Sequence, residues 1–129
     1  HVRPWQHVLD PLIGYLMLAI KQYLNKINNE EHAWNFGPNN NNFKKVIDVV
    51  KYIKKLQNFN YEIIKNKKFK ETRTLKLNSI KAKKKLRWLP KWNLSDSLKN
   101  TIDWNGNVKK GFSAKFVCEQ QFLMYINKK

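Results

Sequence analysis

The chain has 129 residues, enough for one domain or for a piece of a larger one. Its longest apolar run, residues 16–20, falls well short of the roughly 20 residues that span a bilayer, and we expect no secretory leader. A single cysteine, Cys118, excludes an internal disulfide and is typical of a reducing compartment. We therefore expect a soluble, cytoplasmic chain with no membrane partner.

The charge is strongly basic, with 26 Lys and Arg against 9 Asp and Glu and a formal net charge of +17. Such an excess is typical of proteins that bind polyanions. However, the only arginines are Arg3, Arg73 and Arg87, and proteins that read nucleic acids usually depend on arginine. We interpret the lysines as solvated surface and expect no nucleic-acid partner, with a basic nucleic-acid-binding module as the alternative.

Apolar spacing and turn residues predict short strands mixed with helices. Asp10 and Ser79 are expected to cap helices, and Pro90 to hold its segment open. The elements follow no regular βαβ rhythm, and so few strands would leave exposed sheet edges. We predict a small mixed α+β region that forms half of a two-part fold. The strands are expected at residues 2–8, 33–36, 61–64 and 74–77, and the helices at residues 11–27, 43–56, 79–86, 95–104 and 113–126.

Motifs for independent catalysis are missing from the sequence. The four glycines form no phosphate-cradling loop, and the three histidines have no metal-ligand spacing with Cys118. Tyr61 and Lys65 match a Tyr-x-x-x-Lys catalytic pair, but the predicted strand would hold them about 13 Å apart. We therefore predict no catalytic residue and no metal site in this chain.

The segment from Arg3 to Pro11 holds the candidate binding site. Arg3 and Trp5 are two residues apart on a predicted strand, so their side chains emerge on one face. A guanidinium suits phosphate oxygens, and an indole suits a base or a ribose. The pair predicts a nucleotide diphosphate site. The alternative is an ordinary strand–helix corner in which Trp5 belongs to the core.

Four segments of the sequence resemble the CDP-glucose 4,6-dehydratases, a family of the extended short-chain dehydrogenase/reductase superfamily. The resemblance runs in order over essentially all 129 residues. The segments are residues 3–16 (RPWQHVLDPLIGYL), 33–38 (AWNFGP), 71–82, which contain LKL and KA, and 86–92 (LRWLPKW).

This resemblance implies a parent enzyme with an α/β fold that is a homodimer or larger. Its Rossmann half, with bound NAD and the catalytic residues, would be absent here. Residues 1–129 would be the C-terminal sugar-nucleotide-binding portion, inactive alone and binding no NAD. The parent would convert CDP-glucose to CDP-4-keto-6-deoxyglucose, a precursor of deoxysugars for cell-surface polysaccharide, by NAD-mediated oxidation, dehydration and reduction. Another NAD-dependent nucleotide-sugar epimerase or dehydratase is the alternative parent.

The resemblance also implies roles for single residues. Arg3 and Trp5 would contact the nucleotide of the CDP-sugar, and Glu71 would lie near its ribose. His7 would be a packed imidazole. Asp10 would be a helix cap.

Four positions depart from the family pattern: Lys70 stands for His, Asn78 for Asp, Ile80 for Ser and Arg87 for Gly. Lys70 bears on the nucleotide contacts, and Asn78 and Ile80 bear on local capping. Arg87 replaces a glycine that can adopt a left-handed turn, so we expect this turn to be strained or rebuilt.

Overall fold

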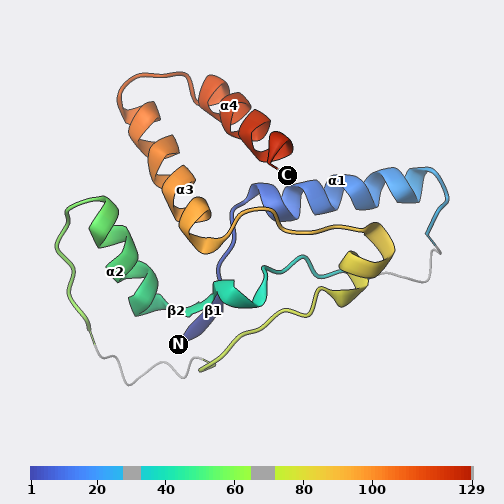
Figure 1. Ribbon diagram of the computed structural model, residues 1–129, viewed down its shortest axis with the longest axis horizontal. Coiled ribbons are helices and arrows are strands. Elements are labelled where there is room, and N and C mark those ends of the chain that lie inside the picture. The colour runs from blue at the N-terminus through green and yellow to red at the C-terminus, as the bar shows by residue number, and fades with distance from the viewer. Residues whose placement is uncertain (28–32, 65–71, 129) are drawn as a thin grey trace.

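The computed structural model describes residues 1–27, 33–64 and 72–128. Within them, short strands and helices form a small mixed α+β region without a Rossmann core, as predicted (Figure 1). The elements are β1 (Val2–Pro4), α1 (Leu9–Tyr23), the 3-10 turn η1 (Asn40–Asn42), β2 (Phe43–Lys45), α2 (Val46–Leu56), the π-helical turn η2 (Ala82–Leu86), α3 (Leu94–Lys109) and α4 (Ala114–Asn127). No helix of the described part is long and apolar enough to cross a membrane.

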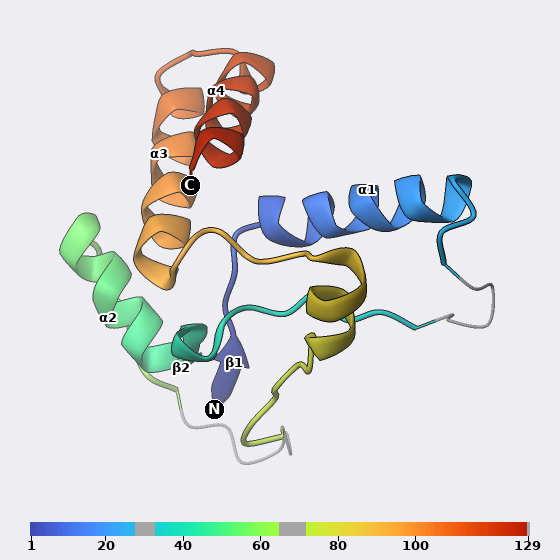
Figure 2. The same cartoon turned by 45° about the vertical axis from the view of Figure 1, so that its right-hand side comes forward.

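Strand β1 lies between two partners. It pairs antiparallel with β2, with Arg3 directly opposite Lys44. On its other side, Val2 forms a parallel bridge with Thr74. Helices α1 and α2 extend to opposite sides of this short sheet, and α3 and α4 form a hairpin (Figures 1 and 2).

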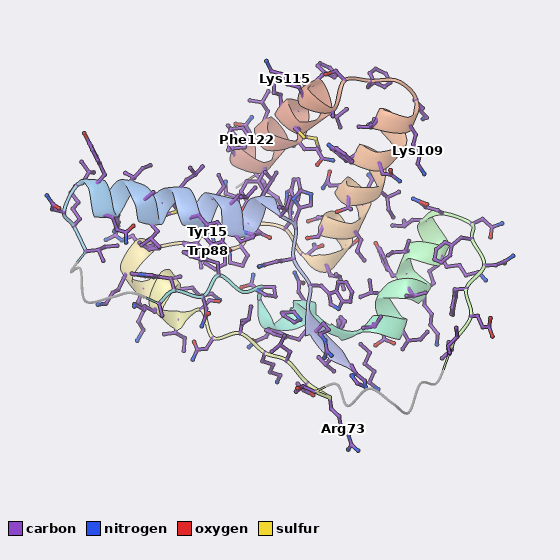
Figure 3. The ribbon with its side chains drawn as sticks, turned by 180° about the vertical axis from the view of Figure 1, so that it is seen from behind. Tyr15, Arg73, Trp88, Lys109, Lys115 and Phe122 are labelled. Atoms are coloured by element: carbon purple, nitrogen blue, oxygen red, sulfur yellow. The ribbon has the colours of Figure 1, made fainter. Side chains whose placement is uncertain are left out.

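The core lies under α1 and beside η2. Phe36, Ala82, Leu86 and Trp88 are buried there. The Phe36 ring meets Trp88 edge-on at 5.2 Å and Tyr15 at 5.3 Å between centroids, and Figure 3 shows Tyr15 and Trp88 close together. A Cβ at Gly14 would collide with the Phe36 ring, so this glycine lets Phe36 approach α1.

Most predicted helices are confirmed, with shifted ends. The helices expected at residues 11–27, 95–104 and 113–126 correspond to α1, α3 and α4. The helix expected at residues 43–56 begins only at Val46, because residues 43–45 pair with β1 as strand β2. The strand expected at residues 2–8 ends at Pro4.

The strands predicted at residues 33–36 and 61–64 are wrong, and only Thr74 of the strand expected at residues 74–77 forms a bridge. Around residues 33–37, side chains supply the backbone hydrogen bonds instead of a neighbouring strand. Gln6 Nε2 donates to the Phe36 carbonyl at 2.8 Å, and the Gly37 N–H donates to Ser79 Oγ at 2.6 Å. The segment is therefore extended without joining a sheet.

The two predicted caps are also wrong. Asp10 lies inside α1, whose N-cap is Val8, and it is His7 Nδ1 that accepts from the Leu9 N–H at 3.3 Å. Ser79 Oγ accepts from the Gly37 N–H, and it is Asn78 Oδ1 that accepts from the Ile80 N–H at 2.9 Å.

Arg87 adopts the left-handed conformation, with φ 57° and ψ 27°. The side chain is exposed and the residue ends η2. A non-glycine residue in this region is strained by about 1 kcal/mol or more. The turn expected at this position therefore forms without a glycine.

Candidate functional site

Arg3 lies in β1 with its guanidinium bound to the local backbone. Its Nη1 donates to the carbonyl of Val2 at 2.8 Å and to that of Thr72 at 3.0 Å, and Nη2 lies 3.4 Å from His1 Nδ1. The side chain is half-buried. These contacts hold a permanent positive charge in one orientation at the short sheet, which is what recognition of an anion requires.

Trp5 follows β1 and continues its ladder. The backbone N–H of Trp5 donates to the carbonyl of Asn42 at 3.1 Å, and the indole Nε1 donates to the carbonyl of Lys44 at 3.1 Å. The indole is half-buried and lies against β2. The structure thus brings Arg3 and Trp5 to the same two strands. Lys44 is paired with Arg3 in the ladder, and its carbonyl accepts from the Trp5 indole.

Glu71, the third residue predicted for this site, lies outside the described residues, as does Lys70. The described chain resumes at Thr72, whose carbonyl accepts from Arg3.

Sequence reasoning missed Lys44, because residues 43–45 were expected to belong to a helix. The available signal was the Lys44–Lys45 pair directly before the amphipathic run that begins at Val46. Only the strand pairing reveals that Lys44 is the direct neighbour of Arg3.

A hollow of about 470 Å³ opens on the α2 side of the sheet, between the start of α2 and residues 61–64. Lys45 and Tyr61 lie on its wall, but Arg3 and Trp5 are not among its lining residues. Its size would admit a small molecule. It is a separate feature from the predicted Arg3–Trp5 site.

A buried polar cluster joins the two ends of the chain. Asp10 Oδ1 accepts from Tyr125 Oη at 2.6 Å and from the Lys91 N–H at 2.9 Å. The indole Nε1 of Trp88 donates to the Asp10 carbonyl at 2.9 Å. His7 packs edge-on against Trp92 at 4.4 Å between ring centroids, so its predicted role as a packed imidazole is consistent with the structure.

Titration in this cluster is governed by burial. Burial lowers the pKa of His7 to about 4, so its imidazole is neutral at pH 7. Burial raises the pKa of the Asp10 carboxyl, against the hydrogen bonds from Tyr125 and Lys91. Burial and the nearby Asp10 carboxylate raise the pKa of the Tyr125 hydroxyl. Asp10 is 0% exposed and Tyr125 1%, so a substrate cannot reach them, and the cluster serves the fold.

The glycines of the described residues do not fit a loop for NAD phosphates. A Cβ at Gly37 would lie 2.7 Å from the Leu77 Cβ, so Gly37, like Gly14, allows close packing. Gly106 lies within α3, and Gly111, with φ 94°, forms the turn after it. Nor do three His, Cys, Asp or Glu side chains gather into a metal site anywhere in the described ranges.

Comparison with known proteins gives one informative match. No family model matches the chain. The CDP-glucose 4,6-dehydratase of Salmonella typhimurium (strain LT2) is 34% identical to it over 106 residues, which make up 81% of this chain and 29% of that protein. The chain thus spans less than a third of the length of this curated relative. It is a distant, partial relative of a CDP-glucose 4,6-dehydratase.

Proposed function

We propose that this chain is the C-terminal, sugar-nucleotide-binding portion of a CDP-glucose 4,6-dehydratase-like enzyme. The observation that carries the proposal is the 34% identity to such a dehydratase over 106 residues. The fixed Arg3 guanidinium supports it, because the diphosphate of a nucleotide sugar needs a cation in a defined orientation.

In this proposal the chain binds and orients the substrate and carries no catalytic residue. Arg3 holds the diphosphate, Trp5 packs against the nucleotide, and Glu71 lies near the ribose. NAD would take hydride from the sugar before water is lost and would return it, as NADH, to the dehydrated sugar. It would be held by a Rossmann part outside these 129 residues, in keeping with the glycines described above. The parent enzyme would act in the cytoplasm as a homodimer or larger assembly.

The exposed apolar face of α1 supports the proposal that a second part of the enzyme packs against this chain. Leu12, Leu16 and Ile20 recur every four residues and are 45%, 58% and 58% exposed, and Tyr23 is 87% exposed. Such a stripe on a helix usually packs against another element. We propose that the NAD-binding part of the same enzyme covers it.

Substitution of Arg3 tests the binding role. A bidentate, charge-assisted contact is worth about 1.5–3 kcal/mol, so Arg3→Ala should weaken CDP-glucose binding roughly 10- to 150-fold by titration calorimetry. In an enzyme reconstituted with an NAD-binding part, KM should rise by a similar factor, with a smaller loss of kcat. Arg3→Lys should recover only part of the affinity, because an ammonium lacks the planar fork.

Arg73→Ala is the matched control, because its side chain points away from the body of the molecule (Figure 3). It should change the affinity less than about twofold. If Arg3→Ala kept its fold by circular dichroism and left the affinity unchanged, the binding role of Arg3 would be wrong. If it unfolded the chain, Arg3 would be a structural residue.

The alternative parent is another nucleotide-sugar epimerase or dehydratase. It differs from a CDP-glucose 4,6-dehydratase in the nucleotide base of the substrate that it binds. Titration with dTDP-glucose and GDP-mannose beside CDP-glucose shows which nucleotide is preferred. The net charge of +17 keeps nucleic acid as a second candidate. Tight binding of duplex DNA that falls steeply with salt, without binding of any nucleotide sugar, would favour that candidate.

A further inference from the structure

We propose that Lys44 is a second phosphate-binding cation of the nucleotide-sugar site and that it acts with Arg3 across the β1–β2 ladder. The inference rests on the proposed function, because it names a further residue of the same site.

The strand register places the two cations together. Arg3 and Lys44 are directly opposite in the antiparallel pair. The flanking bonds, from Trp5 N–H to the Asn42 carbonyl and from Val46 N–H to the His1 carbonyl, make Arg3–Lys44 a hydrogen-bonded pair of the ladder. Directly opposite side chains project from the same face of the sheet. Arg3 and Lys44 therefore share one face.

Trp5 fixes this arrangement from the same side. Its indole donates to the Lys44 carbonyl, so the aromatic ring lies beside the backbone of the second cation. The two residues that were predicted to hold a nucleotide thus converge on Lys44. The Lys44 ammonium would therefore lie beside the diphosphate, if Arg3 binds the diphosphate and Trp5 packs on the nucleotide.

Electrostatics favour an anion at Lys44. Among the described residues, no carboxylate lies within ion-pair distance of the Lys44 ammonium, and the side chain is exposed. A diphosphate carries adjacent negative groups, so Arg3 and Lys44 can contact it together.

Lys45 offers a matched control. It is the next residue on β2 and, like Lys44, is an exposed lysine. Because it is opposite Val2, it projects from the other face, where it lines the hollow beside α2. Lys44→Gln and Lys45→Gln therefore remove the same charge from the same strand on opposite faces.

The test is calorimetric titration of wild type and both variants, each reconstituted with an NAD-binding part, with CDP-glucose, CDP and cytidine. Lys44→Gln should weaken CDP-glucose and CDP binding roughly 5- to 30-fold and leave cytidine binding unchanged, since only the diphosphate is contacted. Lys45→Gln should stay within about twofold of wild type for all three ligands.

The outcomes separate the two levels of proposal. If the wild type binds CDP-glucose and Lys44→Gln binds it as tightly as Lys45→Gln does, the Lys44 inference is wrong and the proposed function stands. If the wild type binds no nucleotide sugar at all, the proposed function itself fails and the Lys44 inference falls with it.

Discussion

His7 and Asp10 show that nearby buried groups can have opposite effects on stability. The imidazole of His7 is 6% exposed and accepts the Leu9 N–H, so it is held neutral, with the remaining proton on Nε2. The Asp10 carboxyl is fully buried and accepts from Tyr125 and Lys91. Acid therefore disfavours the folded state at His7 and favours it at Asp10.

The His7 contribution should appear as a fall in the free energy of unfolding between about pH 6.5 and pH 4. The pKa of His7 is about 4 in the folded chain against 6.5 ordinarily, so in this range only the unfolded chain binds the proton. The loss should approach about 3 kcal/mol when the range is fully crossed. Urea unfolding followed by tryptophan fluorescence measures it.

His7→Asn is the control, because an amide oxygen can accept the Leu9 N–H without titrating. The Asp10 carboxyl has a raised pKa and works in the other direction in both proteins, so the difference between them isolates His7. Parallel loss of stability in wild type and variant over this range would contradict the assignment.

At the scale of elements, α1 is more apolar than its packing requires. One side meets Phe36 through Gly14, and the opposite side presents the stripe of Leu12, Leu16, Ile20 and Tyr23. The regular spacing of the stripe explains why the helix was readily predicted. Its exposure leaves an apolar side of α1 without a packing partner among the described residues.

Leu16→Lys with Ile20→Lys should reduce association of the chain, both with itself and with an NAD-binding part. The two side chains are exposed, so the helical circular dichroism signal should remain. Analytical ultracentrifugation measures the association. The control is Leu123→Lys on α4, a leucine that is 47% exposed. If this control dispersed the assembly equally well, α1 would not be the contact surface.

The sequence predicted the helices better than the strands because their apolar spacing is a local property. Helix α4 was placed within one or two residues at each end. Strand β2 was missed because its three residues become a strand only by pairing with β1, some forty positions away. The extended residues 33–36 look like a strand, yet Gln6 and Ser79, which satisfy the backbone around them, are visible only in the fold.

Arg3 and Trp5 could be selected from sequence because an arginine and an aromatic two apart share a face of a strand. The approach of Arg3 and Trp5 to Lys44 could not be predicted, because it depends on the register between two strands that are distant in the sequence. The Asp10–Tyr125 bond could not be predicted either, since a single aspartate before a proline looks like a cap.

At the scale of the whole molecule, the chain exposes more surface than a compact monomer of its mass. Its accessible surface is 10151 Å², and a compact monomer of 15.5 kDa exposes about 7200 Å². The excess is of the size that one side of a large protein interface buries. This agrees with the proposed second part.

The isolated 129-residue chain should therefore be marginally stable and self-associating. Differential scanning calorimetry should show a broad transition that depends on protein concentration, because uncovered apolar surface favours association. Titration with NAD should show no binding in the micromolar range. A sharp two-state melt of a monomer would indicate an autonomous domain, and micromolar NAD binding would overturn the assignment to the substrate-binding portion.

The bond between Asp10 and Tyr125 spans 115 positions of the chain, and this has a consequence for synthesis on the ribosome. At about 5–20 residues per second, Tyr125 is joined on the order of 10 s after Asp10. Until then the Asp10 carboxyl lacks its bond from the Tyr125 hydroxyl, and the Lys91 N–H is the donor made earlier. Closing so long a loop is entropically slow compared with forming the α3–α4 hairpin. Helix α4 thus completes the hydrogen bonding of a carboxyl in the much earlier α1, and a nascent chain stalled before α4 would lack the bond from Tyr125.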